Sequence, residues 1–164
     1  MKITQEERGK WIALLKGVRF FSLFTEEELG AMLDIGQPLH VNLHEYVIRE
    51  TDVEDDNSFY VILKGAVKVM KKSVNLGKKD LLIIKAGDCF GELAFLIQSR
   101  SAATVLAVKR TASILAVEDC YIFKINPEAV KSLDQSIQLK LYQQFAFALA
   151  ERLKLLTDDI MRPY

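Results

Sequence analysis

Residues 87–105 read GDCFGELAFLIQSRSAATV and bring together a glycine, a carboxylate, a short apolar run and an arginine among small residues. Glu92 stands at the expected first turn of a helix, where backbone N–H groups lack intrahelical acceptors and favour an anion. Gly91 gives a ligand close access to the backbone, and Arg100 offers a planar fork for phosphate oxygens. These residue types predict the binding of a phosphate, with Glu92 accepting hydrogen bonds from sugar hydroxyls.

Short strands are expected to position this segment, because residues 38–125 are rich in Val, Ile, Leu, Phe and Tyr. Turn signals separate them at Gly65, at residues 75–77 and at Gly87. Eight short strands at this spacing predict a sandwich or jelly roll rather than alternating βαβ units. The candidate strands read PLHVNL, EYVIRE, SFYVILKG, AVKVMKK, DLLIIKAG, AATVLAVKR, ASILAVED and YIFKI.

Helices are expected on both sides of the strands, so the predicted fold class is mainly β with flanking helices. Residues 5–33 read as two helical pieces with a break near Gly17, and TEEE places a capping box at Thr25 and Glu28. After the strands, Asn126 and Pro127 open a short helix. A longer helix is expected after Asp134, ending near Asp158.

The long helix carries two apolar faces. One stripe has steps of three and four, and consists of Ile137, Leu141, Phe145, Leu149, Leu153, Leu156 and Ile160. A second face consists of Leu139, Tyr142, Ala146 and Ala150. One face packs on the strands, and the other needs a partner. A symmetric copy of the chain is the expected partner, and packing against the N-terminal helices is the alternative.

Several segments together resemble the cyclic-nucleotide-binding domain family. F-G-E-L-A, a short loop, R, small residues and T-V resemble its phosphate-binding cassette, and SFYVILKGAVKV resembles its strand-turn-strand. VIRETD and SLFTEEEL resemble two further parts, so that residues 24–156 follow the family pattern. The resemblance implies an eight-stranded β-roll that holds the nucleotide. It implies an N-terminal helical segment at 1–37, the β-roll at 38–126 with its cassette at 87–105, and C-terminal helices at 127–164.

The resemblance also implies the ligand-binding residues. Glu92 would meet the ribose 2′-hydroxyl, Gly91 and Leu93 would frame the pocket, and the arginine would meet the cyclic phosphate. The family arginine usually directly precedes the two small residues before T-V, where this chain has Ser101, and Arg100 lies one position earlier. In a strand that offset turns Arg100 outward, unless a bulge or a break restores it. The implied set is Phe90, Gly91, Glu92, Leu93, Ala94, Arg100, Ser101, Ala102 and Ala103.

The expected function is that of a regulatory sensor domain, not of an enzyme. It binds a cyclic nucleotide and signals through its C-terminal helix. Binding of cAMP is favoured over cGMP, because cGMP-preferring forms often carry threonine after the arginine, where this chain has Ser101 or Ala102. The alternative is a domain that has kept the fold, lost the ligand and serves as a protein interaction or dimerisation module. In that case Glu92 caps its helix and Arg100 is solvated.

The amino-acid composition argues against two classes of partner, nucleic acids and membranes. Lysine and arginine number 22 against 22 acidic residues, without a basic block, which argues against a nucleic-acid partner. No apolar run approaches the ~20 residues that span a bilayer, and MKITQEERGKW lacks the features of a signal peptide. We therefore expect a cytoplasmic protein without a membrane partner. Only six residues follow Asp158, too few for a winged helix, so the output is expected through a homodimer or a separate effector protein.

The remaining candidate residues predict no cofactor and no metal site. His40 and His44 are four residues apart, ~13 Å along a strand, which is too far to share one ion. No serine, cysteine or lysine is paired with a base in a recognisable nucleophile motif. Cys89 and Cys120 lie far apart in the sequence and are expected to be buried free thiols.

Overall fold

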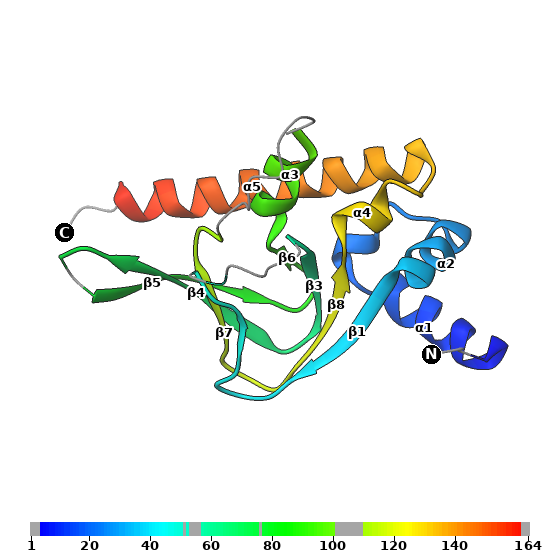
Figure 1. The fold of residues 1–164 in the computed structure, drawn as a ribbon, viewed down its shortest axis with the longest axis horizontal. Coiled ribbons are helices and arrows are strands. Elements are labelled where there is room, and N and C mark those ends of the chain that lie inside the picture. The colour runs from blue at the N-terminus through cyan, green and yellow to red at the C-terminus, as the bar shows by residue number, and fades with distance from the viewer. Residues whose placement is uncertain (1–3, 51, 53–56, 76, 101–109, 162–164) are drawn as a thin grey trace.

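Two four-stranded antiparallel sheets form a roll in the computed structural model, which describes residues 4–50, 52, 57–75, 77–100 and 110–161, with only the backbone at 98–100. The sheet orders are β1-β8-β3-β6 and β2-β7-β4-β5 (Figure 1). This confirms the predicted mainly β class with eight strands. The strands are β1 (Gly36–Val41), β2 (Tyr46–Ile48), β3 (Phe59–Lys64), β4 (Ala66–Ser73), β5 (Gly77–Lys85), β6 (Cys89–Phe90), β7 (Ser113–Ala116) and β8 (Cys120–Ile125).

The strand expected at 102–110 falls almost entirely outside the described residues, and the short strand β6 was not expected. The turns predicted at Gly65 and Gly87 both lie between strands, and both glycines have a positive φ. At the turn between β3 and β4, Gly65 has a φ of +93°, and a Cβ there would lie 2.6 Å from the Asp119 carbonyl oxygen. Only glycine fits such a turn. The β4–β5 hairpin pairs Ser73 with Gly77 across the turn predicted at residues 75–77.

The N-terminal helices follow their local signals. Helix α1 (Gln5–Lys16) ends at Gly17, a short 3₁₀ turn η1 (Arg19–Phe21) follows, and helix α2 (Glu26–Ile35) comes next. At the start of α2 the Thr25 hydroxyl accepts a hydrogen bond from the Glu28 N–H, and the Glu28 carboxylate accepts one from the Thr25 N–H. The predicted break and capping box are therefore both confirmed.

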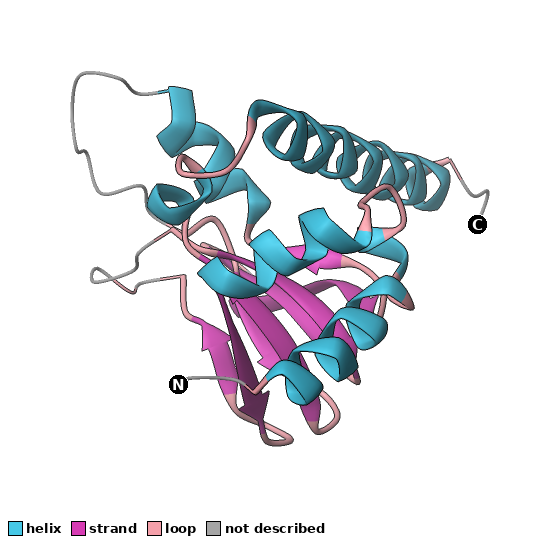
Figure 2. Ribbon diagram, turned by 90° about the vertical axis from the view of Figure 1, so that its right-hand side faces the viewer, coloured by secondary structure: helices cyan, strands magenta, loops and turns pink. Residues whose placement is uncertain are grey.

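Helix α3 (Glu92–Arg100) lies beside the C-terminal helix α5 (Gln135–Ile160), on the same side of the roll, and the short helix α4 (Pro127–Val130) precedes α5 (Figures 1 and 2). Asn126 caps α4, and Pro127 takes its first position, as expected. Helix α5 is slightly longer than predicted and runs across the roll (Figure 2). No helix among the described residues is both long and apolar enough to cross a membrane.

An aromatic cluster joins the helices to one sheet. Phe145 of α5 is fully buried, and its ring centroid lies 4.8 Å from that of Phe59, 5.3 Å from Phe95 and 5.9 Å from Phe20. These rings come from α5, β3, α3 and η1, so one core holds all four elements. A second apolar cluster fills the inside of the roll. The segment boundaries predicted at 37/38 and 126/127 remain predictions. The shared core joins helices and strands and does not separate them into units.

The predicted apolar stripe of α5 is buried only in its first half. Ile137, Leu141 and Phe145 are buried, whereas Leu153 is 67% exposed and Ile160 is 80% exposed. The second predicted face, from Leu139 to Ala150, is exposed in the single chain. Helix α5 therefore consists of an anchored N-terminal half and a C-terminal half with large uncovered apolar side chains.

Candidate functional site

A cavity of about 490 Å³ lies at the mouth of the roll, under helix α5. Its volume is within the range of small-molecule sites. Strands β2, β4, β5 and β7 contribute apolar side chains, α3 contributes its first turn, and α5 contributes four residues. These four residues are Leu149, Arg152, Leu153 and Leu156. Any occupant of the cavity therefore touches both the roll and the C-terminal helix.

The first turn of α3 forms one wall of the cavity. Gly91, immediately before it, has a φ of +81°, and a Cβ there would lie 2.9 Å from the Ser58 carbonyl oxygen. The glycine lets the chain turn sharply from β6 into α3. The first N–H groups of a helix have no intrahelical acceptor. Because Glu92, Leu93 and Ala94 all line the cavity, this end of α3 is placed to bind an anion there.

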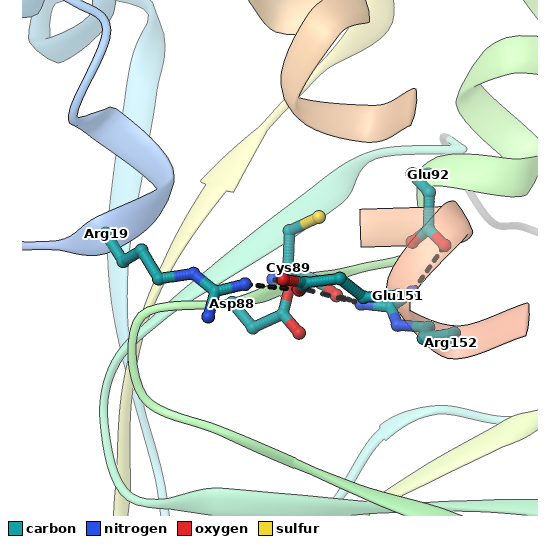
Figure 3. A network of polar contacts seen from close by, with 6 residues as sticks. All are labelled: Arg19, Asp88, Cys89, Glu92, Glu151 and Arg152. Atoms are coloured by element: carbon teal, nitrogen blue, oxygen red, sulfur yellow. Dashed lines mark hydrogen bonds and ion pairs between the residues drawn. The ribbon is translucent and has the colours of Figure 1, made fainter. Parts of the chain in front are cut away.

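Glu92 is a buried carboxylate with a cation beside it. The residue is 3% exposed, and its Oε1 lies 2.5 Å from Nη1 of Arg152 on α5 (Figure 3). Burial raises the pKa of Glu92, while the charge of Arg152 acts in the opposite direction. A carboxylate held in this way is a strong acceptor for hydroxyl groups.

Arg152 holds α5 against the edge of the roll. Besides Glu92, its guanidinium contacts the Asp88 carboxylate at 3.5 Å and donates to the Cys89 carbonyl oxygen. Beside it on α5, Glu151 pairs with Arg19 of η1 (Figure 3). The C-terminal half of α5 is thus fastened by polar contacts, whereas its N-terminal half is fastened by the aromatic core.

A second arginine lies deep in the cavity wall. Arg110 is 4% exposed, and it donates hydrogen bonds to the Gly91 carbonyl oxygen at 3.2 Å and the Ser58 carbonyl oxygen at 2.7 Å. Nearby, the rings of Tyr60 and Phe90 stack at 5.0 Å. Among the described lining residues there are three cations, Lys71, Arg110 and Arg152, and one carboxylate, Glu92. This excess of positive charge favours an anionic occupant.

The described residues of the site suit binding and show no catalytic arrangement. Burial raises the pKa of the Cys89 thiol well above its usual value, which keeps the sulfur protonated and a poor nucleophile. Cys89 and Cys120 are buried and free, as predicted. In the part of the chain that the structure describes, no group of three or more His, Cys, Asp or Glu side chains is placed to hold a metal ion. His40 and His44 are exposed.

Five of the predicted site residues meet at the cavity: Phe90, Gly91, Glu92, Leu93 and Ala94. Arg100 does not lie in a strand, because it is the last of the nine residues of α3. The inward–outward alternation of a strand therefore does not govern Arg100. Its side chain, and the predicted residues Ser101, Ala102 and Ala103, lie outside what the structure describes.

Neither Arg110 nor Arg152 of the cavity was predicted from the sequence. The helical pattern in the sequence could have indicated Arg152, because this residue follows Phe145 by seven positions and so lies on the buried face of the helix. A cation at such a position requires a buried partner. Arg110 had no comparable signal, since it ends a run read as a strand. Tyr142 and Phe145 of α5 both pack on the Phe95 ring.

Comparisons with known proteins point to one family. The family model described as "Cyclic nucleotide-binding domain" matches residues 38–136, more than half of the chain. The cAMP-dependent protein kinase type II regulatory subunit of Drosophila melanogaster is 31% identical over 121 residues, which are 74% of this chain and 30% of that protein. The chain thus spans less than a third of this relative's length.

Solved structures share the fold. A cyclic nucleotide-binding domain from Methylobacillus flagellatus has a TM-score of 0.73 at 19% identity, covering 95% of this chain and 83% of the other. The regulatory domain of Toxoplasma gondii PKA, crystallised with cAMP, has a TM-score of 0.66 at 22% identity, covering 85% and 49%. At these identities the likeness shows the fold, the β-roll with its flanking helices.

Proposed function

Because this chain belongs to the cyclic nucleotide-binding domain family, we propose that it is a regulatory sensor that binds a cyclic nucleotide in the cavity and is not itself catalytic. One observation carries the proposal: the first turn of α3, the buried Glu92 and the excess of cations all face one cavity of ligand size. The buried free thiols suit a reducing compartment, so the proposal includes a cytoplasmic location.

The proposed ligand contacts follow from this geometry. The cyclic phosphate lies at the first N–H groups of α3, and Glu92 accepts hydrogen bonds from the ribose hydroxyls. Phe90, Gly91, Leu93 and Ala94 form the wall beside it. The predicted residues Arg100, Ser101, Ala102 and Ala103 complete the proposed set of ligand contacts. We propose cAMP over cGMP, because no threonine follows Arg100 or Ser101.

Signalling is proposed to pass through α5. Ribose hydroxyls and Arg152 share one acceptor, Glu92, so a ligand alters the contact that fastens the C-terminal half of α5. Leu149, Leu153 and Leu156 of the same helix line the cavity and contact the ligand directly. A ligand shifts α5 only if it binds the two helix arrangements with different affinities, and these contacts supply that difference.

Nucleotide addition to nucleotide-free protein is expected to stabilise the fold, because a ligand that binds only the folded state adds its binding energy. At 100 times the dissociation constant the gain is about 2.7 kcal/mol. A thermal-shift titration with cAMP, cGMP and 5′-AMP measures it, and we expect the largest shift with cAMP. Glu92→Gln should weaken the response. No shift at millimolar cAMP or cGMP would refute the sensor and favour an interaction module without a ligand.

The proposal includes a homodimer formed through α5. Phe147, Leu153, Leu155, Ile160 and Met161 are each more than 60% exposed in the single chain, and a symmetric copy is the commonest cover for such a face. A separate effector protein is the other occupant, and it is also the partner expected for a module without a ligand.

Light scattering at high micromolar concentration is expected to give the mass of two chains. Ile160→Asp should shift the mass toward one chain, because a carboxylate at an apolar contact is costly to bury. Val74→Asp is the control for a new charge outside α5, since Val74 is fully exposed in the turn between β4 and β5. A monomer at every concentration would contradict the dimer.

A further inference from the structure

A second pocket, of about 220 Å³, lies between β2 and the β4–β5 hairpin, where β7 begins. We call it the basic groove. Its described lining residues are Tyr46, Arg49, Glu50, Met70, Lys71, Lys72, Lys78 and Ser113. Lys71 also lines the proposed nucleotide cavity, so the two sites are neighbours. The proposed binding of a nucleotide does not account for the basic groove.

Positive charge dominates the basic groove. Its described lining contains four cations, Arg49, Lys71, Lys72 and Lys78, and one carboxylate, Glu50. That carboxylate accepts a hydrogen bond from the backbone N–H of Lys72 at 3.1 Å. Among the ion pairs formed between described residues, none includes one of the four cations. The basic groove therefore presents an excess of positive charge to a partner.

The β4–β5 hairpin places like charges opposite one another. In the register of the two strands, Lys71 pairs with Lys79 and Lys72 pairs with Lys78, and all four residues are exposed. Like charges directly opposite each other in a strand pair are destabilising. The hairpin thus carries an electrostatic cost in the single chain, and an anion bound beside these side chains would offset it.

Tyr46 holds two of the cations in place. Nζ of Lys78 donates a hydrogen bond to the Tyr46 hydroxyl at 3.0 Å, and Cζ of Arg49 lies 4.2 Å from the centre of the Tyr46 ring. A hydroxyl and an aromatic face fix the positions of these charges but do not neutralise them. Because the side chains are already positioned, less conformational entropy is lost when they bind a partner.

The form of the basic groove favours a protein segment as the partner. A concave pocket receives single side chains, whereas a bilayer presents a broad surface that does not enter it. The groove is confined to one hairpin and the strand ends beside it, and the chain as a whole has 22 basic and 22 acidic residues. Domains that bind nucleic acids typically have a strongly basic composition and an extended basic face.

We propose that the basic groove docks an acidic segment of a partner protein, a short stretch rich in aspartate and glutamate. Their carboxylates accept charge-assisted hydrogen bonds from the lysines and from Arg49. This inference goes beyond the proposed binding of a nucleotide and does not depend on it. It gives the expected effector protein a place of contact on the roll, next to the cavity.

Fluorescence anisotropy of a labelled peptide of about eight glutamates tests the inference on the full chain. We expect saturable binding that weakens when NaCl is raised from about 0.05 to about 0.5 M, because salt screens exposed charges. Lys72→Gln/Lys78→Gln should weaken peptide binding about 5- to 30-fold. Neither lysine lines the nucleotide cavity, so the thermal shift of this variant with cAMP should equal that of the parent protein.

Lys64→Gln/Lys85→Gln is the matched control. It removes the same charge from two exposed lysines that do not line the basic groove, and it should leave the affinity for the peptide unchanged. Equal losses in the two double variants would show that only the net charge matters and would overturn the inference.

The melting temperature without peptide tests the electrostatic cost of the hairpin. Lys72→Gln removes one of the two like-charge pairs, so the melting temperature should rise. A fall would show that Lys72 has a structural role in the single chain, and the inference would lose its premise.

Other occupants give different results. No binding of the glutamate peptide by the parent protein at any salt concentration would refute the inference. Binding only to vesicles that contain phosphatidylserine, or only to single-stranded DNA, would assign the groove to a membrane or a nucleic acid. Peptide binding that appears only after Glu54, Asp55 and Asp56 are changed to their amides would assign it to the chain's own acidic run. Each of these results overturns the inference and leaves the proposed nucleotide site standing, which the titration with cAMP tests separately.

Discussion

Replacing Arg152 with methionine is expected to lower the free energy of unfolding near neutral pH by about 3 kcal/mol, because it leaves a carboxylate buried without its cation. The side chains of Arg152 and Glu92 are 13% and 4% exposed, and they form the buried ion pair of the cavity. Methionine keeps an unbranched apolar stem of similar length, so little packing is lost. Urea denaturation followed by circular dichroism measures the change.

The loss should depend on pH in a direction set by Glu92. Burial raises the pKa of Glu92 against the attraction of Arg152, and removing the arginine raises this pKa further. A carboxyl group with a raised folded-state pKa adds stability below its unfolded-state pKa and loses that contribution as the pH rises through the folded-state pKa. The deficit of Arg152→Met should therefore be small below pH 4.5, the ordinary value, and grow to its full size toward neutral pH.

Two comparisons isolate the buried charge. The double variant Glu92→Gln/Arg152→Met should recover most of the loss, because no uncompensated carboxylate remains. Arg19→Met breaks the neighbouring pair with Glu151, whose side chains are 68% and 54% exposed, and should cost less than about 1 kcal/mol. Similar losses for Arg19→Met and Arg152→Met, or no recovery in the double variant, would show that Arg152 does not act through Glu92.

Replacing Phe145 with alanine is expected to lower the free energy of unfolding by about 4 kcal/mol, within the range for buried aromatic truncations. The ring is fully buried and contacts Phe20, Phe59 and Phe95. Its removal leaves a cavity where η1, β3, α3 and α5 meet. Because rigid aromatic neighbours surround the site, it has little capacity to collapse. Equilibrium unfolding in urea measures the loss.

Phe147→Ala is the matched control for this variant. Phe147 lies two residues further along α5 and is 62% exposed, so the same truncation should change the stability of the single chain by less than about 0.5 kcal/mol. The measurement is made at low concentration, where a dimer through α5 does not contribute. Equal effects of the two truncations would mean that the anchor of α5 is not the aromatic cluster.

Local patterns in the sequence were sufficient to predict many helix starts and turns of the fold. The capping box at Thr25 and Glu28, the cap at Asn126 with Pro127, and the turn at Gly65 were all predicted and confirmed. Each depends on a few neighbouring residues, because capping hydrogen bonds and a positive φ are decided within one turn of chain. The end of α3 was missed, because Phe95 anchors this helix in a core built from distant segments.

Part of the candidate site could likewise be predicted from neighbouring residues, and part depends on contacts between distant segments. The cassette residues from Phe90 to Ala94 are adjacent in the chain, so their residue types alone predicted an anion site at a helix start. The pairing of Arg152 with Glu92 joins residues 60 positions apart, and that of Arg110 with Gly91 joins residues 19 apart. Such pairs form only when the roll closes and α5 packs across it, because packing sets which distant side chains share a cavity. The sequence by itself therefore determined the local frame that favours a phosphate, and the tertiary structure decided which cations lie beside it and that α5 forms one wall of the cavity.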